Sequence, residues 1–270
     1  MNHFPIGVFD SGLGGLTAVR ELRRILPNEN IVYFGDTGRV PYGTRSAETI
    51  EHYAFQDMRF LLSKKVKLII AACGTVSSVA AGAATGLNIP FTGVVVPAAH
   101  AAAAETRNLK VGIIGTSATI RSKSYEEELH RINAHIEVFS RDCPLFVSMV
   151  ENGFTSPDNE ITKAVVEHYI RPFVASGVDT LILGCTHFPI LKEAIANVLG
   201  ARTSLIDAGY EAAHYAKSLM EKGGIMNSST EAGKCSFYVT DQIQNFSSIA
   251  GLFLGEDITG DVNRVDLDTL

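Results

Sequence analysis

Two cysteines lie in matching sequence contexts, and each could move a proton. Cys73 ends the apolar run KLIIAAC (67–73), and Cys185 ends the apolar run DTLILGC (179–185). A thiol at the point where a strand turns into a helix faces backbone N–H groups, which favour the thiolate over the thiol. We therefore expect the pKa of each thiol to fall from about 8.5 towards neutral pH, so that each can serve as a general base.

A pair of such bases fits one class of reaction. Inverting a stereocentre requires one base that removes a proton from one face of a carbon and a second group that delivers a proton to the opposite face. Cys73 and Cys185 meet this requirement if they lie on opposite walls of one cleft.

Two further ionisable residues lie beside these positions. His187 follows Cys185 by two residues in GCTHFP, where it can orient the thiol or share its proton. Asp10 ends the first apolar run as the matching carboxylate of the other wall, and it can also cap the following helix. Cys185 and His187 are also compatible with a Cys–His hydrolase or transferase, which leaves Cys73 without a role. A non-catalytic binding module is a third alternative.

Hydroxyl side chains gather at the same predicted strand ends, where they could hold a carboxylate together with helix N-termini. The glycine-rich loop SGLGG (11–15) fits the dinucleotide fingerprint poorly, because Thr17 stands where that fingerprint has a third glycine. We interpret the loop as a tight turn whose N–H groups face a carboxylate. The candidate hydroxyl residues are Ser11, Thr75, Thr116, Thr119 and Thr186.

Short apolar runs alternate with longer amphipathic segments along almost the whole chain. This alternation indicates parallel sheets covered by helices on both faces, and ligands bind beyond the carboxyl ends of such strands. The predicted strands are 6–10, 31–36, 67–73, 91–96, 110–116, 135–140, 179–185, 202–208 and 236–240. The predicted helices are 16–26, 47–62, 76–84, 207–222 and 242–254.

The same pattern of segments occurs in each half of the chain. Residues 6–15 (IGVFDSGLGG) are similar to 111–120 (VGIIGTSATI), and 68–77 (LIIAACGTVS) are similar to 181–190 (LILGCTHFPI). We interpret this as an ancient duplication that gives two similar α/β units facing each other. The last stretch, 207–270, is expected to return to the first half.

Composition excludes several classes of protein. The 270-residue chain is 46% hydrophobic and 19% charged, which supports a sizeable core. Its 23 basic and 29 acidic residues give a net charge of −6, so we expect no nucleic-acid partner and no membrane partner. The sequence has no signal-peptide pattern and no apolar stretch near the roughly 18 residues of a membrane span. We therefore expect a cytoplasmic protein. The four cysteines form no CxxC motif, so no metal site is expected, and Cys143 and Cys235 are assigned structural roles.

Together the motifs resemble those of the cofactor-independent glutamate racemases in the aspartate/glutamate racemase superfamily. The resemblance runs nearly from end to end, and the motifs occur in the same order. They are IGVFDSGLGG (6–15), YFGDTGRVPYG (33–43), ACGTVSS (72–78), VGIIGTSATI (111–120), CPLFVSMVENG (143–153), LILGCTHFPIL (181–191) and IDAG (206–209).

This resemblance implies an enzyme that interconverts L- and D-glutamate for peptidoglycan synthesis, with no cofactor and no metal. Cys73 would exchange a proton with the D-isomer and Cys185 with the L-isomer. Asp10, His187 and Glu151 would assist. A racemase for aspartate or another acidic amino acid is the alternative. The implied substrate-binding residues are Asp10, Ser11, Pro41, Tyr42, Gly43, Gly74, Thr75, Thr116, Thr119 and Thr186.

The resemblance also implies an architecture. We expect an α/β fold of two pseudo-symmetric, doubly wound α/β domains with mainly parallel sheets and an inter-domain active-site cleft. The first domain would comprise 1–96 plus 207–270 and carry Cys73, and the second would comprise 97–206 and carry Cys185. A homodimer is expected because family members commonly form one.

One position departs from the family pattern. The family usually has Cys-Asn-Thr at the first thiol, with the Asn amide contacting substrate, whereas this chain has Gly74. Losing a charge-assisted hydrogen bond typically costs about 1.5–3 kcal/mol if nothing replaces it. From the sequence we expect that Gly74→Asn leaves turnover intact and does not impair glutamate binding.

Overall fold

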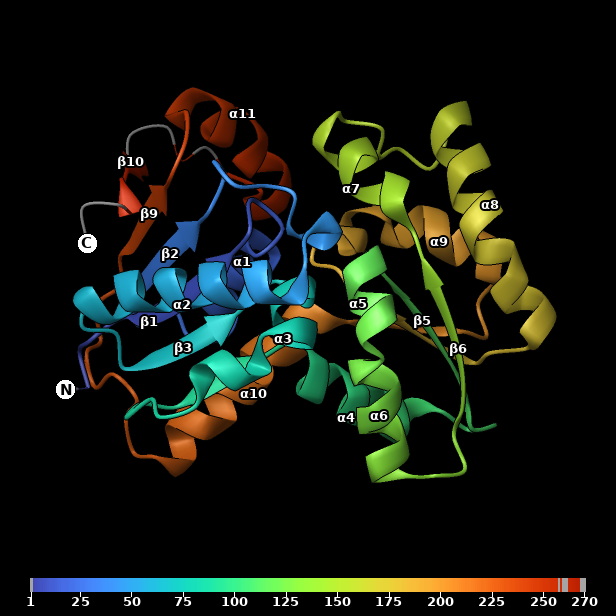
Figure 1. Cartoon of the computed structure of the whole chain (residues 1–270), viewed down its shortest axis with the longest axis horizontal. Helices are drawn as coiled ribbons and strands as arrows, with labels where there is room; N and C mark the ends of the chain where they lie inside the picture. Colours follow the sequence, from blue (N-terminus) through green and yellow to red (C-terminus); the bar gives the residue numbers. More distant parts are fainter. Residues whose placement is uncertain (1, 257, 259–261, 268–270) are drawn as a thin grey trace.

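The computed structural model describes residues 2–256, 258 and 262–267, and within them the strands form two sheets (Figure 1). The strands are β1 (Ile6–Asp10), β2 (Ile31–Gly35), β3 (Leu68–Ala71), β4 (Phe91–Gly93), β5 (Lys110–Gly115), β6 (Glu137–Asp142), β7 (Thr180–Leu183), β8 (Ser204–Asp207), β9 (Cys235–Val239) and β10 (Val262–Arg264). The larger sheet has the order β10-β9-β2-β1-β3-β4, and the smaller sheet has the order β6-β5-β7-β8. All the strand pairings within them are parallel.

The two sheets share one winding pattern, which confirms the expected pseudo-symmetric fold class. The order β2-β1-β3-β4 in the larger sheet corresponds strand for strand to β6-β5-β7-β8 in the smaller one. In each sheet the chain adds its second strand on one side of the first strand and its third strand on the other side. The resulting switch points, between β1 and β3 and between β5 and β7, are where open α/β sheets bind ligands.

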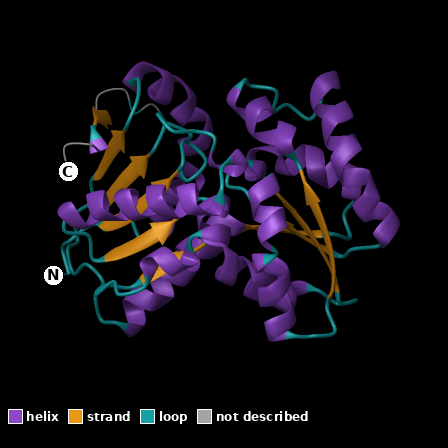
Figure 2. Cartoon of the chain, viewed as in Figure 1, coloured by secondary structure: helices purple, strands orange, loops and turns teal. Residues whose placement is uncertain are grey.

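Helices cover both faces of each sheet (Figure 2). In β1 the alternation of side chains sends Ile6 and Val8 to one face of the larger sheet and Phe9 to the other, so two apolar layers form. The helices are α1 (Leu16–Ile25), α2 (Ala47–Ser63), α3 (Gly74–Val79), α4 (Val95–Glu105), α5 (Ser117–Ser122), α6 (Ser124–Ile132), α7 (Pro144–Glu151), α8 (Glu160–Ser176), α9 (Lys192–Leu199), α10 (Ala208–Lys222) and α11 (Ile243–Leu254).

Two of the predicted elements are clearly shorter than expected, and β10 and the helices α5 to α9 were not given ranges from the sequence. The strand expected over 91–96 is confined to β4, and α4 begins at Val95, because alanine-rich 95–105 favours a helix and Pro97 lies in its first turn, where no intrahelical N–H is needed. The helix expected over 76–84 is shorter, since α3 ends at Val79 and a 3₁₀ turn follows over Ala81–Ala84.

The chain leaves the larger sheet after β4 and returns to it after β8. As expected, the returning segment packs on the first half, where α10 contacts α1, β3 and β4. The division into domains 1–96 plus 207–270 and 97–206 stays a prediction, and residues 1, 257, 259–261 and 268–270 of it lie outside the described residues. No helix in the described part of the chain is long and apolar enough to cross a membrane.

Asp207 caps the helix on which the chain returns. Its carboxylate accepts hydrogen bonds from the backbone N–H groups of Gly209 at 2.9 Å and Tyr210 at 3.1 Å. We predict that Asp207→Ala lowers the free energy of unfolding by about 0.5–2 kcal/mol, while Asp207→Asn, which keeps an acceptor, stays close to the unsubstituted protein. Urea denaturation measures both changes. Equal stability of the alanine variant and the unsubstituted protein would contradict the capping role.

Candidate active site

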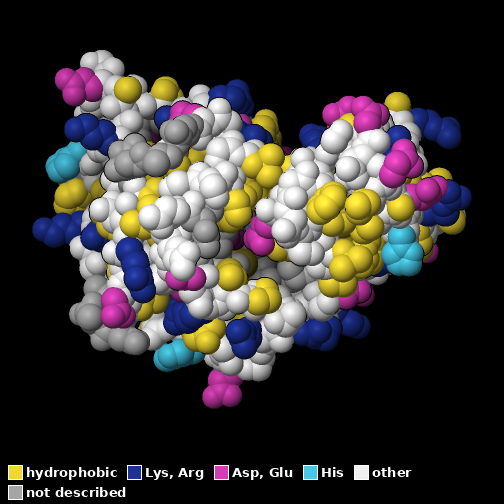
Figure 3. All heavy atoms as spheres, turned by 90° about the horizontal axis from the view of Figure 1, so that it is seen from above, with side chains coloured by type: hydrophobic (Ala, Val, Ile, Leu, Met, Phe, Trp, Pro, Cys, Tyr) yellow, Lys and Arg dark blue, Asp and Glu magenta, His cyan; other side chains and the backbone are white. Residues whose placement is uncertain are grey.

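A cavity of about 320 Å³ lies where the carboxyl ends of the two sheets meet. Figure 3 shows that the surface is hollowed between the two halves. Loops that follow β1, β2 and β3 form one side of the cavity, and loops that follow β5, β6 and β7 form the other. The lining residues are Asp10, Ser11, Gly12, Val40, Pro41, Tyr42, Gly43, Thr44, Cys73, Gly74, Thr75, Thr116, Ser117, Cys143, Pro144, Val147, Ser148, Glu151, Cys185, Thr186 and His187.

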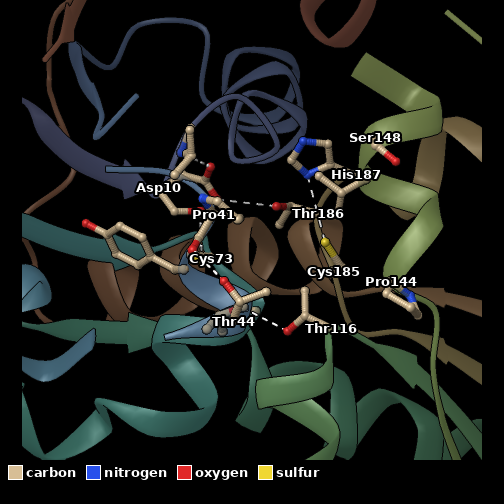
Figure 4. A pocket seen from close by; sticks show the side chains of 18 of the residues that line it. Asp10, Pro41, Thr44, Cys73, Thr116, Pro144, Ser148, Cys185, Thr186 and His187 are labelled. Atoms are coloured by element: carbon tan, nitrogen blue, oxygen red, sulfur yellow. Dashed lines mark hydrogen bonds between the residues drawn. The ribbon is translucent and has the colours of Figure 1, made fainter. Parts of the chain in front are cut away.

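The two thiols face this cavity from different halves. Cys73 lies two residues beyond β3, and Cys185 lies two residues beyond β7, the corresponding strand of the smaller sheet. In Figure 4, Cys73 lies with Asp10 and Pro41, whereas Cys185 lies with His187 on the other side. The geometry therefore offers one proton-carrying sulfur from each half to a single small molecule.

On the side of the cavity formed after β1, β2 and β3, which we call the first wall, the ionisable side chains are buried. Asp10 is buried, and its carboxylate accepts a hydrogen bond from the backbone N–H of Gly12 at 2.7 Å, so it holds the loop before α1. Burial raises the pKa of Asp10, and the opposing charge of His187 offsets only part of that rise. The Cys73 thiol donates to Ser11 Oγ at 3.6 Å.

The expected fall in the pKa of Cys73 is wrong. Cys73 does lie at the N-cap of α3, but burial raises the pKa of its thiol to about 12, and the nearby Asp10 charge adds to that rise. Hydrogen bonds from Ser11 and from the backbone of Val76 act in the opposite direction and do not outweigh desolvation. Cys73 is therefore a thiol at neutral pH and is ready to donate a proton.

The second wall surrounds its thiol with a different set of groups. The chain after Cys185 forms a 3₁₀ turn over Phe188–Leu191 before α9 begins. Cys185 Sγ lies 3.8 Å from His187 Nδ1, and His187 Nε2 lies 2.9 Å from Glu151 Oε1. The imidazole therefore bridges a sulfur and a carboxylate.

This bridge determines the charge of His187. Burial by itself lowers the pKa of the imidazole, but hydrogen bonds to Cys185 and Glu151, together with the nearby negative charges, raise it to about 10. His187 is therefore an imidazolium at neutral pH. A cation 3.8 Å from the Cys185 sulfur stabilises a negative charge on that sulfur.

Polar contacts join the two walls beside the cavity. Thr186 Oγ1 donates to Asp10 Oδ2 at 3.4 Å, and Thr17 Oγ1 donates to the Thr186 carbonyl at 3.3 Å. On the other side of the thiols, the Thr75 and Thr116 hydroxyls lie 2.9 Å apart. The two switch points thus contact each other directly.

The loop that carries Pro41 to Thr44 is held from behind by a buried ionic network. Tyr42 is buried, and its hydroxyl donates to Asp36 and, at 3.2 Å, to Asp57 of α2. Arg39 pairs with Asp36 Oδ2 at 2.5 Å and with Asp57 Oδ1 at 3.0 Å. Burial and the Asp36 charge raise the pKa of Asp57. The hydroxyl of Tyr42 is therefore committed to this network.

Most of the residues singled out from the sequence meet in this cavity. Thr119 does not line it, and its hydroxyl instead lies 3.0 Å from that of Thr116. Cys143, which was given only a structural role, is buried in the lining. The residues brought into the lining are Asp10, Ser11, Pro41, Tyr42, Gly43, Cys73, Gly74, Thr75, Thr116, Glu151, Cys185, Thr186 and His187.

Sequence reasoning missed one wall of the cavity, although a signal was present. Pro144, Val147, Ser148 and Glu151 all line it from α7. Their spacing of i, i+3, i+4 and i+7 places them on one face of that helix. Of these four residues the sequence analysis identified only Glu151, because it did not consider the helical spacing within CPLFVSMVENG (143–153).

The comparisons with known proteins agree with this geometry. The Asp/Glu/Hydantoin racemase family matches residues 8–216. Glutamate racemases of Geobacter metallireducens and Syntrophus aciditrophicus are 42% and 44% identical to this chain, over 97% of each chain. The crystal structure of glutamate racemase from Francisella tularensis in complex with D-glutamate has a TM-score of 0.91 and 41% identity, and it covers 100% of both chains.

The family match and the related structure define the class of protein as an amino-acid racemase, an isomerase. The chain belongs to the Asp/Glu/Hydantoin racemase family.

Arg39 is the cation of the network behind the Pro41 loop. Arg39→Ala would leave Asp36 and Asp57, whose side chains have no exposed area, without their cation. We predict a loss of about 3–5 kcal/mol in the free energy of unfolding at pH 7. Arg59→Ala, at an exposed position of the same helix as Asp57, is the matched control and should change stability by less than about 0.5 kcal/mol. Similar urea midpoints for the two variants would contradict a supporting role for Arg39.

The charge of His187 can be measured directly. Its raised pKa, about 10, predicts that the ring stays protonated at pH 8, where an isolated histidine is neutral. Because the folded pKa lies above the unfolded value, this group stabilises the fold fully below about pH 6.5, and that contribution is lost as the pH rises through about 10.

We predict that Glu151→Gln lowers the pKa of His187, because it removes the charge that accepts the Nε2 proton. NMR titration of the labelled ring measures the shift. Glu160→Gln, which replaces an exposed carboxylate of α8, is the control. If the pKa of His187 is the same in Glu151→Gln as in the unsubstituted protein, then Glu151 does not stabilise the charged form of His187.

Proposed function

We propose that this racemase acts on glutamate and interconverts its L- and D-isomers with the two thiols as the proton-carrying groups. The observation that carries the proposal is the placement of Cys73 and Cys185, one from each half, in the lining of a single cavity. The substrate assignment rests on relatives of 42% and 44% identity that are named glutamate racemase and on the related structure that binds D-glutamate.

The protonation states on the two walls suit the first half-reaction from L-glutamate. The His187 imidazolium stabilises negative charge on the Cys185 sulfur, which then removes the α-proton. Cys73 is a thiol because burial raises its pKa, and it donates a proton to the opposite face of the same carbon. The reverse reaction requires Cys73 as the base, and each turnover exchanges the states of the two sulfurs.

Substrate binding depends on hydroxyl and N–H groups. The lining supplied by the described residues contains neither lysine nor arginine, so a substrate carboxylate must be held by neutral donors and by His187. Ser11, Thr75 and Thr186 supply hydroxyls close to the thiols. Such fixed donors stabilise the negative charge that develops when the α-proton leaves. The Asp10 and Glu151 carboxylates are acceptors for the substrate ammonium group.

The wider setting is part of the proposal. D-glutamate formed here supplies peptidoglycan synthesis in the cytoplasm, with no added cofactor, and the protein works as a homodimer. Each of the two sheets belongs to one domain. Residues 1–96 plus 207–270 form the domain that carries Cys73, and residues 97–206 form the domain that carries Cys185. The similarity to glutamate racemases over nearly the whole chain supports these assignments.

A Cys–His hydrolase is a weaker account of the same residues. The contact of 3.8 Å between Cys185 Sγ and His187 Nδ1 allows a nucleophilic pair. It gives no role to Cys73, which lines the same cavity.

We predict that the purified protein, without added cofactor, converts L-glutamate to D-glutamate and that Cys73→Ala and Cys185→Ala each reduce the rate by at least about 10²-fold, since each removes a general acid–base group. Chiral chromatography of the amino acid measures conversion, and circular dichroism confirms folding. Cys235→Ala, at a position outside the cavity lining, is the matched control.

L-aspartate is assayed in parallel. Conversion of aspartate but not glutamate would keep the two-thiol mechanism and overturn the substrate assignment. Full activity in either folded thiol variant would overturn the mechanism.

A further inference from the structure

The buried imidazole of His187 contacts a side chain from a distant part of the sequence. Phe253 of α11 is also buried, and its ring centroid lies 5.3 Å from that of His187, with the two ring planes 84° apart. Such an edge-to-face arrangement is among those that aromatic rings favour. His187 follows β7 of the smaller sheet, whereas α11 packs on α1 beside the larger sheet (Figure 1). The contact therefore joins the two halves of the molecule.

The helix that carries Phe253 is tied to the first half at its start. Ahead of α11, the Thr240 hydroxyl donates to Asp36 Oδ1 at 2.9 Å, so the segment is bonded to the buried ionic network behind the Pro41 loop. Phe253 lies in the last turn of α11, which ends because Gly255 adopts a φ of 79°, a left-handed conformation that favours glycine. The helix thus reaches from that network to the imidazole.

His187 meets both of its partners in only a narrow range of ring orientations. Its Nδ1 lies 3.8 Å from Cys185 Sγ, and its Nε2 lies 2.9 Å from Glu151 Oε1. The terminal torsion of a histidine side chain has broad preferences, so the side chain itself does not fix this orientation. A rotation of the ring about that torsion moves both nitrogens away from their partners at once. The surrounding packing must therefore hold the ring.

Two groups of the first half restrict the imidazole. A Cβ atom on Gly14 would lie 2.5 Å from His187 Nδ1, so the glycine-rich turn lies against one edge of the ring. Phe253 packs against the same ring at nearly a right angle. Phe253 does not line the cavity, so its effect on a bound substrate passes through His187.

We propose that Phe253 is a positioning residue that holds the His187 imidazole in line with Cys185 and Glu151. This inference rests on the proposed two-thiol racemisation, in which the charged imidazole stabilises the Cys185 thiolate. Without the aromatic ring of Phe253, the imidazole has room to turn away from its two partners. The hydrogen bonds that favour its charged form are then weakened, and burial lowers the pKa of His187.

The experiment compares Phe253→Leu with Phe60→Leu, since leucine keeps each position apolar and removes the aromatic ring. Phe60 of α2 is buried outside the cavity lining, and its ring centroid lies 4.7 Å from that of Phe34, so it is the matched control. NMR titration of the labelled His187 ring measures its pKa. Chiral chromatography measures kcat for glutamate inversion, and circular dichroism confirms folding.

For Phe253→Leu we expect the pKa of His187 to fall and kcat to fall about tenfold, an effect that the loss of one aromatic contact can produce. The alkaline limb of the pH–rate profile should move to lower pH, because the imidazolium loses its proton at a lower pH. Phe60→Leu should match the unsubstituted protein in both quantities. An unchanged His187 pKa in folded Phe253→Leu, or an equal fall in both variants, overturns the inference and leaves the proposed function standing.

The titration of His187 needs no substrate. Failure of the unsubstituted protein to convert glutamate therefore overturns the proposed function, while the titration still decides whether Phe253 holds the imidazole. Nuclear Overhauser contacts between the ring protons of His187 and Phe253 in the unsubstituted protein remain measurable if Phe253→Leu does not fold. Their presence supports the inference, and their absence overturns it.

Discussion

Desolvation of ionisable side chains, where the carboxyl ends of two parallel sheets meet, is the interaction on which the rest of this structure depends. Asp10, Cys73 and His187 all lie there, away from bulk water. Burial raises the pKa values of Asp10 and Cys73 and by itself would neutralise His187. The partners of the imidazole, Cys185 and Glu151, together with the nearby Asp10 charge, raise its pKa again and return it to the charged form. The same desolvation strengthens every electrostatic interaction with a bound substrate.

The two halves repeat one strand order but have chemically different walls. Cys73 has a hydroxyl partner and a neighbouring carboxylate, whereas Cys185 has a cationic partner. This difference leaves Cys73 a thiol at neutral pH and places an imidazolium beside Cys185. Pseudo-symmetry of the backbone thus places two sulfurs at equivalent positions, and the side chains around them give the two sulfurs different surroundings.

Features encoded locally could be predicted from the sequence. Apolar runs of four to six residues located β1, β3, β5 and β7, and the residues after each run proved to lie together, because parallel strands of a doubly wound sheet end at the same edge. The boundary between β4 and α4 was missed because Val94 to Val96 continue an apolar run that is equally compatible with a strand or a helix.

Features that depend on distant parts of the chain could not be predicted in the same way. The raised pKa of Cys73 follows from burial by both halves, and the contact of Phe253 with His187 joins positions far apart in sequence. The sequence did contain a signal for the buried ionic network around Asp57. This carboxylate falls among the buried positions Ala54, Met58 and Leu61 of α2, where an acidic residue needs a partner.

The most direct test of the two-thiol account is the position of deuterium at early times, when L-glutamate is converted in D₂O by the unsubstituted protein. Removal of the proton by one sulfur and delivery by the other predicts D-glutamate that carries deuterium at its α-carbon, while the remaining L-glutamate is still largely protonated there. Mass spectrometry of the separated isomers measures both. D-glutamate that retains the original proton, or deuterium that enters L-glutamate as fast as inversion occurs, would mean that a single base serves both faces and would contradict the account.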